Sequence, residues 1–304
     1  MSANHFADRL VERIAHVASP LCVGLDPHLQ QIPAEFGVRP EQPASEDTSG
    51  GVRRFFSVVL EACEGRVAIV KPQSAFFEQM GFRGIRVLEE VVAEARQRGL
   101  LVLMDAKRGD IGSTAAAYAR TYCFPNSPCR ADALTLNPYL GLDSLEPFLE
   151  ASRLHGVGLF VLARTSNPGA RDFQDRRTDG LPLYQQVARA LKDPAESLLG
   201  ASGWSNLGVV AGATYPLEAR QLREALAHSP FLVPGYGAQG ASLEQTLAGF
   251  VARGARLEGG IVSSSRGILF GTPGSSEAYR QGLVERLDVA GDELGRACGL
   301  RAVA

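Results

Sequence analysis

Four charged residues follow an apolar run in this chain, and the types and spacing of three of them make these three candidates for chemistry. The segment Leu101–Ile111 reads L-V-L-M-D-A-K-R-G-D-I, with Asp105, Lys107 and Asp110 in the order D-x-K-x-x-D. Because side chains two apart along a strand point to the same face, Asp105 and Lys107 are expected to project together from the carboxyl end of a buried strand. Charges there are costly unless they pair or act. A structural ion pair and a catalytic group are both open interpretations of this segment alone, and the rest of the chain favours catalysis.

The composition is typical of a soluble globular protein with material for a large core. The chain has 304 residues, of which 45% are hydrophobic and 21% charged, and its mean hydropathy is -0.02. A net charge of -2 gives no electrostatic footprint for nucleic acid or an anionic membrane, so neither is expected as a partner. Residues 1–13 predict an amphipathic helix without the apolar region of a secretory signal. The five cysteines form no C-x-x-C pair, which favours a reducing, cytoplasmic setting without a zinc site.

Short apolar runs alternate with segments of helical periodicity along the chain. Strands are expected at Leu21–Leu25, Val67–Val70, Leu101–Met104, Ala133–Leu136, Gly158–Ala163, Leu207–Ala211, Phe231–Val233 and Gly260–Val262. Helices are expected at Val52–Cys63, Gly84–Arg98, Gly112–Tyr122, Leu142–His155, Leu183–Leu191, Pro216–Ala227 and Ser242–Arg253. Eight strands in about 250 residues favour a closed barrel over an open doubly wound sheet. We therefore expect residues 1–304 to form one α/β domain, a (β/α)8 TIM barrel with extended surface loops.

Three stretches do not fit the barrel pattern and are expected to be insertions. Arg39–Gly51 is rich in Pro, Glu, Ser and Gly and predicts a mobile surface loop. Phe124–Arg130 predicts a turn cluster. Asn167–Gly180 predicts a charged loop after the fifth strand, which could be a solvated surface or a lid that covers a substrate.

Polar residues recur where the predicted strands end, which is where α/β barrels place their chemistry. In chain order these residues are Asp26, Lys71, Asp105, Lys107, Thr135, Asn137, Arg164, Thr165, Ser166 and Ser263–Arg266. One lysine that faces two carboxylates could be structural. So many polar side chains converging on one rim indicate an active site.

The last two predicted strands supply a candidate anion site. The loop Pro234–Gly240 reads P-G-Y-G-A-Q-G, and its glycines let backbone N–H groups approach a ligand closely. Gln239 adds an amide donor, and Arg266 after the eighth strand adds a forked cation suited to phosphate. The loops after strands seven and eight are the usual phosphate site of such barrels. A phosphorylated small molecule is therefore the expected substrate, and a glycine-rich turn needed only for its geometry is the alternative.

Four motifs taken together resemble the orotidine 5'-phosphate decarboxylase family. They are Gly24-Leu25-Asp26, Val70-Lys71-Pro72, Asp105–Ile111 and Pro234–Gly240, in the order that the family has them. The D-x-K-x-x-D-I element is the most discriminating of these. The extended loops and the Thr165–Pro168 stretch are similar to the longer bacterial branch of the family. One departure is the run Ser263–Ser265 before Arg266, because many members have Gly directly before that arginine.

The resemblance implies conversion of orotidine 5'-monophosphate to UMP and CO₂ with no metal and no organic cofactor. Lys107 would stabilise the charge that develops at C6 and then deliver the proton. Asp105 would hold Lys107 charged and in place, and Lys71 and Asp110 would complete an alternating charge network.

The same resemblance implies roles in substrate binding. Asp26 and Lys71 would contact ribose hydroxyls, and Ser166 would contact the pyrimidine edge. The phosphate would be held by the residues of the anion site, namely Gln239, Arg266, Gly237 and, more weakly, Tyr236. Asp110 and Thr114 would reach into the active site of a neighbouring subunit, which implies a homodimer with shared sites.

Two rival functions stay open. A metal-dependent sugar-phosphate lyase, such as a hexulose-phosphate synthase or a keto-gulonate-phosphate decarboxylase, shares the barrel and the D-x-K-x-x-D element but needs Mg²⁺. Lys71 and the P-G-Y-G-A-Q-G loop favour the nucleotide enzyme over it. The second rival is a non-catalytic barrel that senses a sugar phosphate or nucleotide. A mere binder has no use for a proton donor beside two carboxylates, so Lys107 between Asp105 and Asp110 argues against it.

Overall fold

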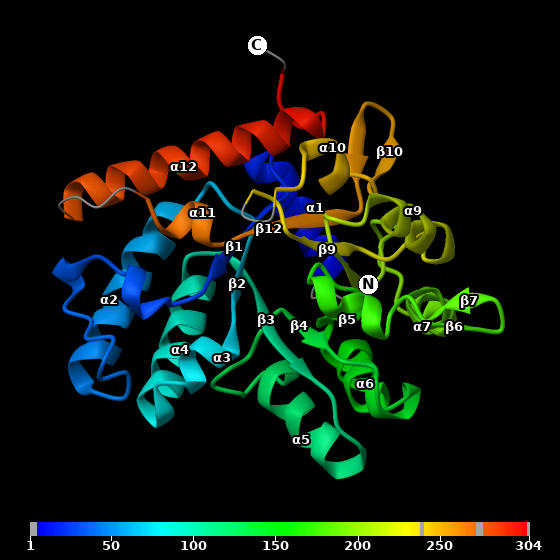
Figure 1. Ribbon diagram of the computed structural model, residues 1–304, viewed down its shortest axis with the longest axis horizontal. Coiled ribbons are helices and arrows are strands. Elements are labelled where there is room, and N and C mark those ends of the chain that lie inside the picture. Colours follow the sequence, from blue (N-terminus) through cyan, green and yellow to red (C-terminus); the bar gives the residue numbers. More distant parts are fainter. Residues whose placement is uncertain (1–4, 238–239, 272–275, 303–304) are drawn as a thin grey trace.

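Eight parallel strands close into a barrel in the computed structural model of this chain (Figure 1). The structure describes residues 5–237, 240–271 and 276–302. The barrel strands are β1 (Leu21–Leu25), β2 (Ile69–Pro72), β3 (Leu101–Arg108), β4 (Ala133–Leu136), β5 (Gly158–Arg164), β8 (Leu207–Ala211), β9 (Phe231–Pro234) and β12 (Gly260–Ser264). Around the barrel they run in the order β1-β12-β9-β8-β5-β4-β3-β2, and β12 pairs with β1 to close it. The predicted (β/α)8 fold is confirmed.

Helices surround the barrel, and most of them connect one barrel strand to the next (Figure 1). They are α1 (Phe6–Val17), α2 (Glu46–Cys63), α3 (Ser74–Glu78), α4 (Gly81–Gln97), α5 (Gly112–Cys123), α6 (Glu146–His155), α7 (Leu183–Ala190), α8 (Lys192–Glu196), α9 (Pro216–Ala225), α10 (Leu243–Thr246), α11 (Arg266–Leu269) and α12 (Ser276–Ala297). The sequence did not predict α12, a 22-residue helix that packs beside α2 and α11.

Apolar side chains fill the amino-terminal half of the barrel interior. Each barrel strand contributes at least one of them: Cys22, Ile69, Leu101, Leu103, Ala133, Phe160, Val210, Leu232 and Ile261. Helix α1 lies across this end of the barrel and adds Phe6, whose ring meets the edge of Phe160 at a centroid distance of 6.0 Å. The interior is thus a packed core and not a channel, as is usual for this architecture.

The inward side chain becomes polar two residues further along four of these strands, because side chains alternate along a strand with a period of two. These positions are Lys71 after Ile69, Asp105 after Leu103, Thr135 after Ala133 and Ser263 after Ile261. The same alternation that builds the apolar core therefore delivers a layer of polar groups directly above it.

The loop predicted over Arg39–Gly51 is wrong for its second half, because α2 already begins at Glu46. Ser45 caps this helix, and its Oγ accepts a hydrogen bond from the backbone N–H of Thr48 at 3.2 Å. Gly51 is buried, and a Cβ there would lie 2.6 Å from the carbonyl oxygen of Phe36. The glycines that suggested a loop instead allow the first turns of α2 to pack closely against the preceding segment.

The helix predicted over Ser242–Arg253 begins as expected but ends early. Ser242 and Gln245 form a reciprocal capping box at the start of α10. After Thr246 the chain leaves the helix and forms a hairpin in which β10 (Val251–Arg253) pairs antiparallel with β11 (Arg256–Glu258). Gly254, with φ at +60°, lies in the tight turn between them. The helical periodicity of this stretch was therefore misleading, because glycines direct the chain into a turn there.

No helix within the described ranges is long and apolar enough to cross a membrane. All five cysteines are buried and carry free thiols, including Cys123 and Cys129, which lie six residues apart in the sequence. They act as small core side chains.

Candidate active site

A cavity of about 550 Å³ opens at the carboxyl ends of the barrel strands. Its floor is the polar layer above the apolar core, and its rim is formed by the loops that follow β1, β5, β9 and β12. The polar residues that line it are Asp26, Lys71, Gln73, Asp105, Lys107, Thr135, Thr165, Ser166, Asn167, Gln174, Tyr236, Ser263, Ser264, Ser265 and Arg266. A volume of this size is in the range of small-molecule sites. Of the polar residues predicted to meet at one rim, all but Asn137 and Arg164 line this cavity.

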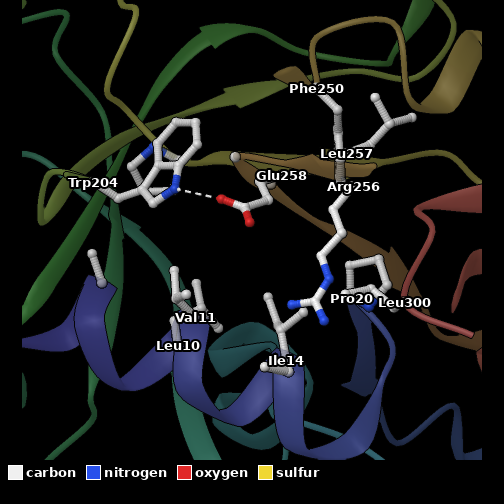
Figure 2. A pocket seen from close by; sticks show the side chains of 15 residues that line it. Leu10, Val11, Ile14, Pro20, Trp204, Phe250, Arg256, Leu257, Glu258 and Leu300 are labelled. Atoms are coloured by element: carbon white, nitrogen blue, oxygen red, sulfur yellow. Dashed lines mark hydrogen bonds between the residues drawn. The ribbon is translucent and has the colours of Figure 1, made fainter. Parts of the chain in front are cut away.

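A second cavity lies at the opposite end of the barrel, where α1 packs over the strand starts (Figure 2). It holds only about 60 Å³ and has mainly apolar walls, with Leu10 and Ile14 of α1 facing Trp204 across it. The indole Nε1 donates to Glu258 at 3.4 Å. This cavity is too small for a nucleotide and contains none of the predicted site residues.

Asp105 is the centre of the polar layer because four donors surround its carboxylate. Oδ1 accepts from Lys107 Nζ at 2.5 Å and from Thr135 Oγ1 at 2.9 Å. Oδ2 accepts from Lys71 Nζ at 2.8 Å and from Gln73 Nε2 at 3.3 Å. A carboxylate offers about four acceptor positions, so the acceptor capacity of Asp105 is filled by two cations and two neutral donors.

This arrangement stabilises the charged forms of the buried pair. Burial alone would raise the pKa of the Asp105 carboxyl, but the charges and hydrogen bonds of Lys71 and Lys107 hold that pKa well below its usual range. Burial alone would lower the pKa of Lys71, but Asp105 and then Asp26 raise it above its usual range. Asp105 and Lys71 are therefore an ion pair at neutral pH.

The two lysines differ in how they face the cavity. The side chain of Lys71 is 9% exposed and lies wedged beside Asp105, whereas that of Lys107 is 43% exposed. Lys107 therefore presents its ammonium group to whatever occupies the cavity, while Asp105 holds it from behind. A cation held in this way can stabilise negative charge on a ligand and can donate a proton.

Two polar atoms on the cavity wall have no hydrogen-bond partner within the described part of the chain. They are Oδ1 of Asp26 at the end of β1 and Oγ of Ser265 after β12, and both are buried. Gly24 lets these two segments approach, because a Cβ there would lie 2.6 Å from the Cβ of Ser265. Unpaired buried polar atoms are costly, so these two are suited to hydroxyl groups of a ligand.

The segment after β5 folds over one side of the cavity. It contains a 3₁₀ turn (Pro168–Asp172) and a short hairpin of β6 (Arg177–Thr178) and β7 (Leu181–Pro182). The side-chain amide of Gln174 brackets Thr165, accepting from its backbone N–H at 2.9 Å and donating to its Oγ1 at 2.9 Å. Because Gln174 and Asn167 line the cavity, this segment forms part of its wall and not only a solvated surface.

Arg164 anchors the same segment from below. Its side chain is 1% exposed and pairs with Asp175 at 3.2 Å. Its guanidinium also stacks on the ring of Tyr215 at 3.7 Å from the centroid. The end of β5, two residues before Ser166 at the cavity, is thus tied to the loop after β8.

The predicted anion site is described in part. Gly235, Tyr236 and Arg266 line the cavity, and no ion partner of Arg266 lies within the described ranges. Gly235 and Gly237 have φ of +110° and +73°, values that a glycine adopts without strain. Gln239 lies outside the described residues. Arg266 remains available for a ligand anion.

Tyr236 is only partly committed to the cavity. Its hydroxyl donates to Glu293 of α12, and burial together with this carboxylate raises the pKa of Tyr236. Its ring lines the cavity while its hydroxyl is engaged elsewhere. Its weaker role in phosphate binding stays a prediction.

Comparison with known proteins identifies the family. A sequence model described as "Orotidine 5'-phosphate decarboxylase / HUMPS family" matches residues 19–280. The chain belongs to this family. The orotidine 5'-phosphate decarboxylase of Rhodopirellula baltica is 42% identical over 301 residues, which cover 98% of this chain and 95% of that protein. The orotidine 5'-phosphate decarboxylase of Haloarcula marismortui is 41% identical and covers 98% of this chain and 96% of its own length. The predicted enzyme class, a carboxy-lyase, is thereby confirmed.

Solved structures of the family have the same fold. The Leishmania donovani OMP decarboxylase superposes with a TM-score of 0.71 at 33% identity, covering 94% of this chain and 98% of that chain. A crystal structure from Streptomyces avermitilis, assigned as an orotidine 5'-phosphate decarboxylase, superposes with a TM-score of 0.81 at 39% identity. That superposition covers 99% of this chain and 98% of that one.

Asp110 and Thr114, which the resemblance assigns to a neighbouring subunit's site, do not line the cavity of their own chain. Asp110 accepts a hydrogen bond from the backbone N–H of Ile111 at 2.8 Å and forms no ion pair within the described residues. Thr114, on the first turn of α5, is exposed. The single chain therefore brings together Asp26, Lys71, Asp105 and Lys107 but leaves these two outside.

Sequence reasoning missed two cavity residues, namely Gln73, which donates to Asp105, and Gln174, which brackets Thr165. Gln73 follows Lys71 by two positions, so the two-residue alternation that places Lys71 at the cavity could also have indicated Gln73. Gln174 is 8 residues beyond Ser166 in an irregular segment, and no local pattern points to it.

Proposed function

We propose that this chain converts orotidine 5'-monophosphate to UMP and CO₂ without a metal or an organic cofactor, with Lys107 as the proton donor. The observation that carries this proposal is the ammonium of Lys107, which is held 2.5 Å from Asp105 Oδ1 and opens onto a nucleotide-sized cavity. Family membership and the named activity of the relatives support the same substrate.

The reaction must break the bond between C6 and the carboxylate carbon. The electron pair stays on C6, CO₂ leaves, and the resulting carbanion is poorly delocalised by the pyrimidine ring. The Lys107 ammonium stabilises that charge as it develops and then transfers a proton to C6, which gives UMP. The neutral lysine regains a proton from water after turnover.

Asp105 and Lys71 prepare Lys107 for this step. Asp105 stays ionised because two cations flank it, and its negative charge keeps the Lys107 ammonium in place. Lys71 contacts the other carboxylate oxygen of Asp105, so the charged groups of the site are in place before substrate arrives. Preorganised charge of this kind costs no reorganisation at the moment of reaction.

The remaining predicted residues supply binding. Asp26 and Lys71 bind ribose hydroxyls, since the unpaired Oδ1 of Asp26 needs a donor. Ser166 contacts the pyrimidine edge. Arg266, with Gln239 and the backbone at Gly237, holds the phosphate at the other end of the cavity. Binding energy gained there can orient the ring at Lys107.

The proposal extends to a homodimer with shared sites. Asp110 and Thr114 lie outside their own cavity, and large apolar side chains are exposed at the same end of the barrel. Ile111, at the start of α5, is 58% exposed, and Tyr139 and Leu140, after β4, are 81% and 49% exposed. An exposed apolar group of this kind marks a protein interface. In a twofold dimer it would place each Asp110 near the partner's Lys107.

The geometry disfavours the metal-dependent lyase. Mg²⁺ is bound through carboxylate oxygens, but the acceptor positions of Asp105 are already taken by Lys71, Lys107, Thr135 and Gln73. Activity that EDTA removes and Mg²⁺ restores would overturn the orotidine proposal.

The direct test is to incubate the protein with orotidine 5'-monophosphate and follow the loss of orotate absorbance. The wild-type chain should turn over, and Lys107→Ala should abolish turnover while largely retaining affinity for UMP. A wild-type protein that binds UMP but shows no absorbance change at high concentration would favour the nucleotide sensor instead.

A further inference from the structure

Thr135 is a fully buried residue of β4 whose hydroxyl has three partners at the centre of the site. It donates to Asp105 Oδ1 at 2.9 Å and accepts from the backbone N–H groups of Ala106 at 3.0 Å and Lys107 at 2.9 Å. A threonine hydroxyl has one donor and two acceptor positions, so all of its capacity is used.

These bonds support an irregularity in β3. Met104 pairs with Leu134 and Arg108 pairs with Leu136, so Thr135 alone lies opposite the three residues between Met104 and Arg108. The extra residues cannot all pair with the backbone of β4. The Thr135 hydroxyl takes over for the backbone carbonyl that a regular ladder would have offered to Ala106 and Lys107.

The irregularity places Lys107 in an unusual backbone conformation. Its φ is +47°, in the left-handed region that residues other than glycine seldom adopt. Such a conformation persists only where the surroundings impose it, and it is often found where a side chain must be directed to a site. Here the surroundings are the hydrogen bonds of Thr135 on one side and the ammonium contact with Asp105 on the other.

We infer that Thr135 is a positioning residue for the proposed reaction, which fixes Lys107 relative to Asp105. The same hydroxyl holds the backbone of Lys107 and the carboxylate that its ammonium contacts. It therefore fixes the positions of both the backbone and the ammonium group of Lys107. Without the hydroxyl, the N–H groups of Ala106 and Lys107 lose their acceptor and Asp105 loses a donor. The bulge then relaxes and the proton donor moves away from C6. This inference rests on the proposed function.

The alternative is that Thr135 only stabilises the barrel. Thr48 offers a matched comparison, because it too is fully buried and its hydroxyl bonds to the backbone N–H and C=O of Arg39 at 3.1 and 3.0 Å. Thr48 does not line the cavity. Replacing either threonine by valine removes a buried hydroxyl of the same shape, but only one of them touches the site.

The experiment compares Thr135→Val, Thr135→Ser and Thr48→Val by kcat, KM, affinity for UMP and melting temperature. Thr135→Val should lower kcat by about 100-fold, the size of effect expected when a reacting group is displaced by about 1 Å. Its KM and UMP affinity should stay close to the wild type, because the binding residues are untouched. Thr135→Ser should restore most of kcat, and Thr48→Val should lose stability but not kcat.

Two results would overturn the inference. One is a Thr135→Val enzyme whose kcat stays within about threefold of the wild type, since a displaced donor should cost far more. The other is a crystal structure of Thr135→Val in which Lys107 keeps its left-handed φ and its contact with Asp105, whatever the activity. If Thr135→Val does not fold, Thr135→Ala provides the same comparison with less bulk. The wild-type rate on orotidine 5'-monophosphate tests the proposed function separately, so either idea can fail alone.

Discussion

Removing the charge of Asp105 should destabilise the fold in a way that depends on pH. In Asp105→Asn, the ammonium of Lys71 stays buried, with 7% of the residue exposed, but loses the carboxylate 2.8 Å away. Breaking a buried ion pair by removing one partner costs about 3–5 kcal/mol. Because Asp26 remains nearby and offsets part of the loss, we expect about 3 kcal/mol at pH 7, the lower end of that range.

The pH dependence follows from the direction of each pKa. In the wild type, the pKa of Asp105 is lowered and that of Lys71 is raised. The stability from Asp105 is therefore present above the unfolded carboxyl pKa of about 3.9, and that from Lys71 is present below the unfolded lysine pKa of about 10.4. The Asp105–Lys71 pair therefore adds no pH dependence to the unfolding free energy between these two pH values. In the variant, burial should dominate and lower the pKa of Lys71. The stability of the variant should therefore rise with pH as Lys71 loses its proton.

The assay is guanidinium unfolding of the wild type and Asp105→Asn at pH 7 and at pH 9.5, at one protein concentration. The difference in unfolding free energy should narrow by at least about 1.4 kcal/mol at the higher pH, the equivalent of one pKa unit. Asp179→Asn is the control. Asp179 is exposed and has a φ of +53°, which Asn tolerates equally well. A difference below about 1 kcal/mol at pH 7, or one that does not change with pH, would refute this account of the Lys71–Asp105 pair.

Two further predictions concern the phosphate and the dimer. Arg266→Gln should lower kcat/KM for orotidine 5'-monophosphate by about 10- to 100-fold, since it removes a charge-assisted contact of about 1.5–3 kcal/mol. The rate with the nucleoside orotidine, which lacks the phosphate, should be unchanged, and an equal loss on both substrates would argue against phosphate binding by Arg266. If sites are shared, mixing the inactive variants Lys107→Ala and Asp110→Ala should restore about a quarter of wild-type activity, because half of the dimers then contain one intact site. Activity that does not recover after subunit exchange, verified by mass spectrometry, would contradict the shared site.

The barrel itself was predictable because each strand is a short apolar run whose ends are marked in the sequence. Leu21–Leu25, Ala133–Leu136 and Leu207–Ala211 were predicted with the boundaries that the structure shows. These strands are buried on both faces, so apolar runs, and not alternation, reveal them. The family and its enzyme class could be predicted as well, because the motifs that carry the resemblance lie at the ends of such strands.

The details of the site depended on contacts that no single strand encodes. Strand β3 was expected to end at Met104 but continues to Arg108, because Thr135 of the neighbouring strand supplies the hydrogen bonds that its backbone lacks. Gln174 reaches the cavity only through the fold of the segment after β5. Both depend on tertiary partners far apart in the sequence, which local periodicity cannot report.

The apolar core formed by the eight strands and α1 also determines how reactants and protons exchange with solvent. Since Phe6, Phe160 and their neighbours fill the amino-terminal half of the interior, the described residues leave the cavity open on the side where Lys107 is exposed. In the proposed reaction, nucleotide, CO₂ and the proton that recharges Lys107 therefore share that opening. Occupancy of this opening by UMP, or its closure by the segment after β5, would therefore delay the return of Lys107 to its charged form.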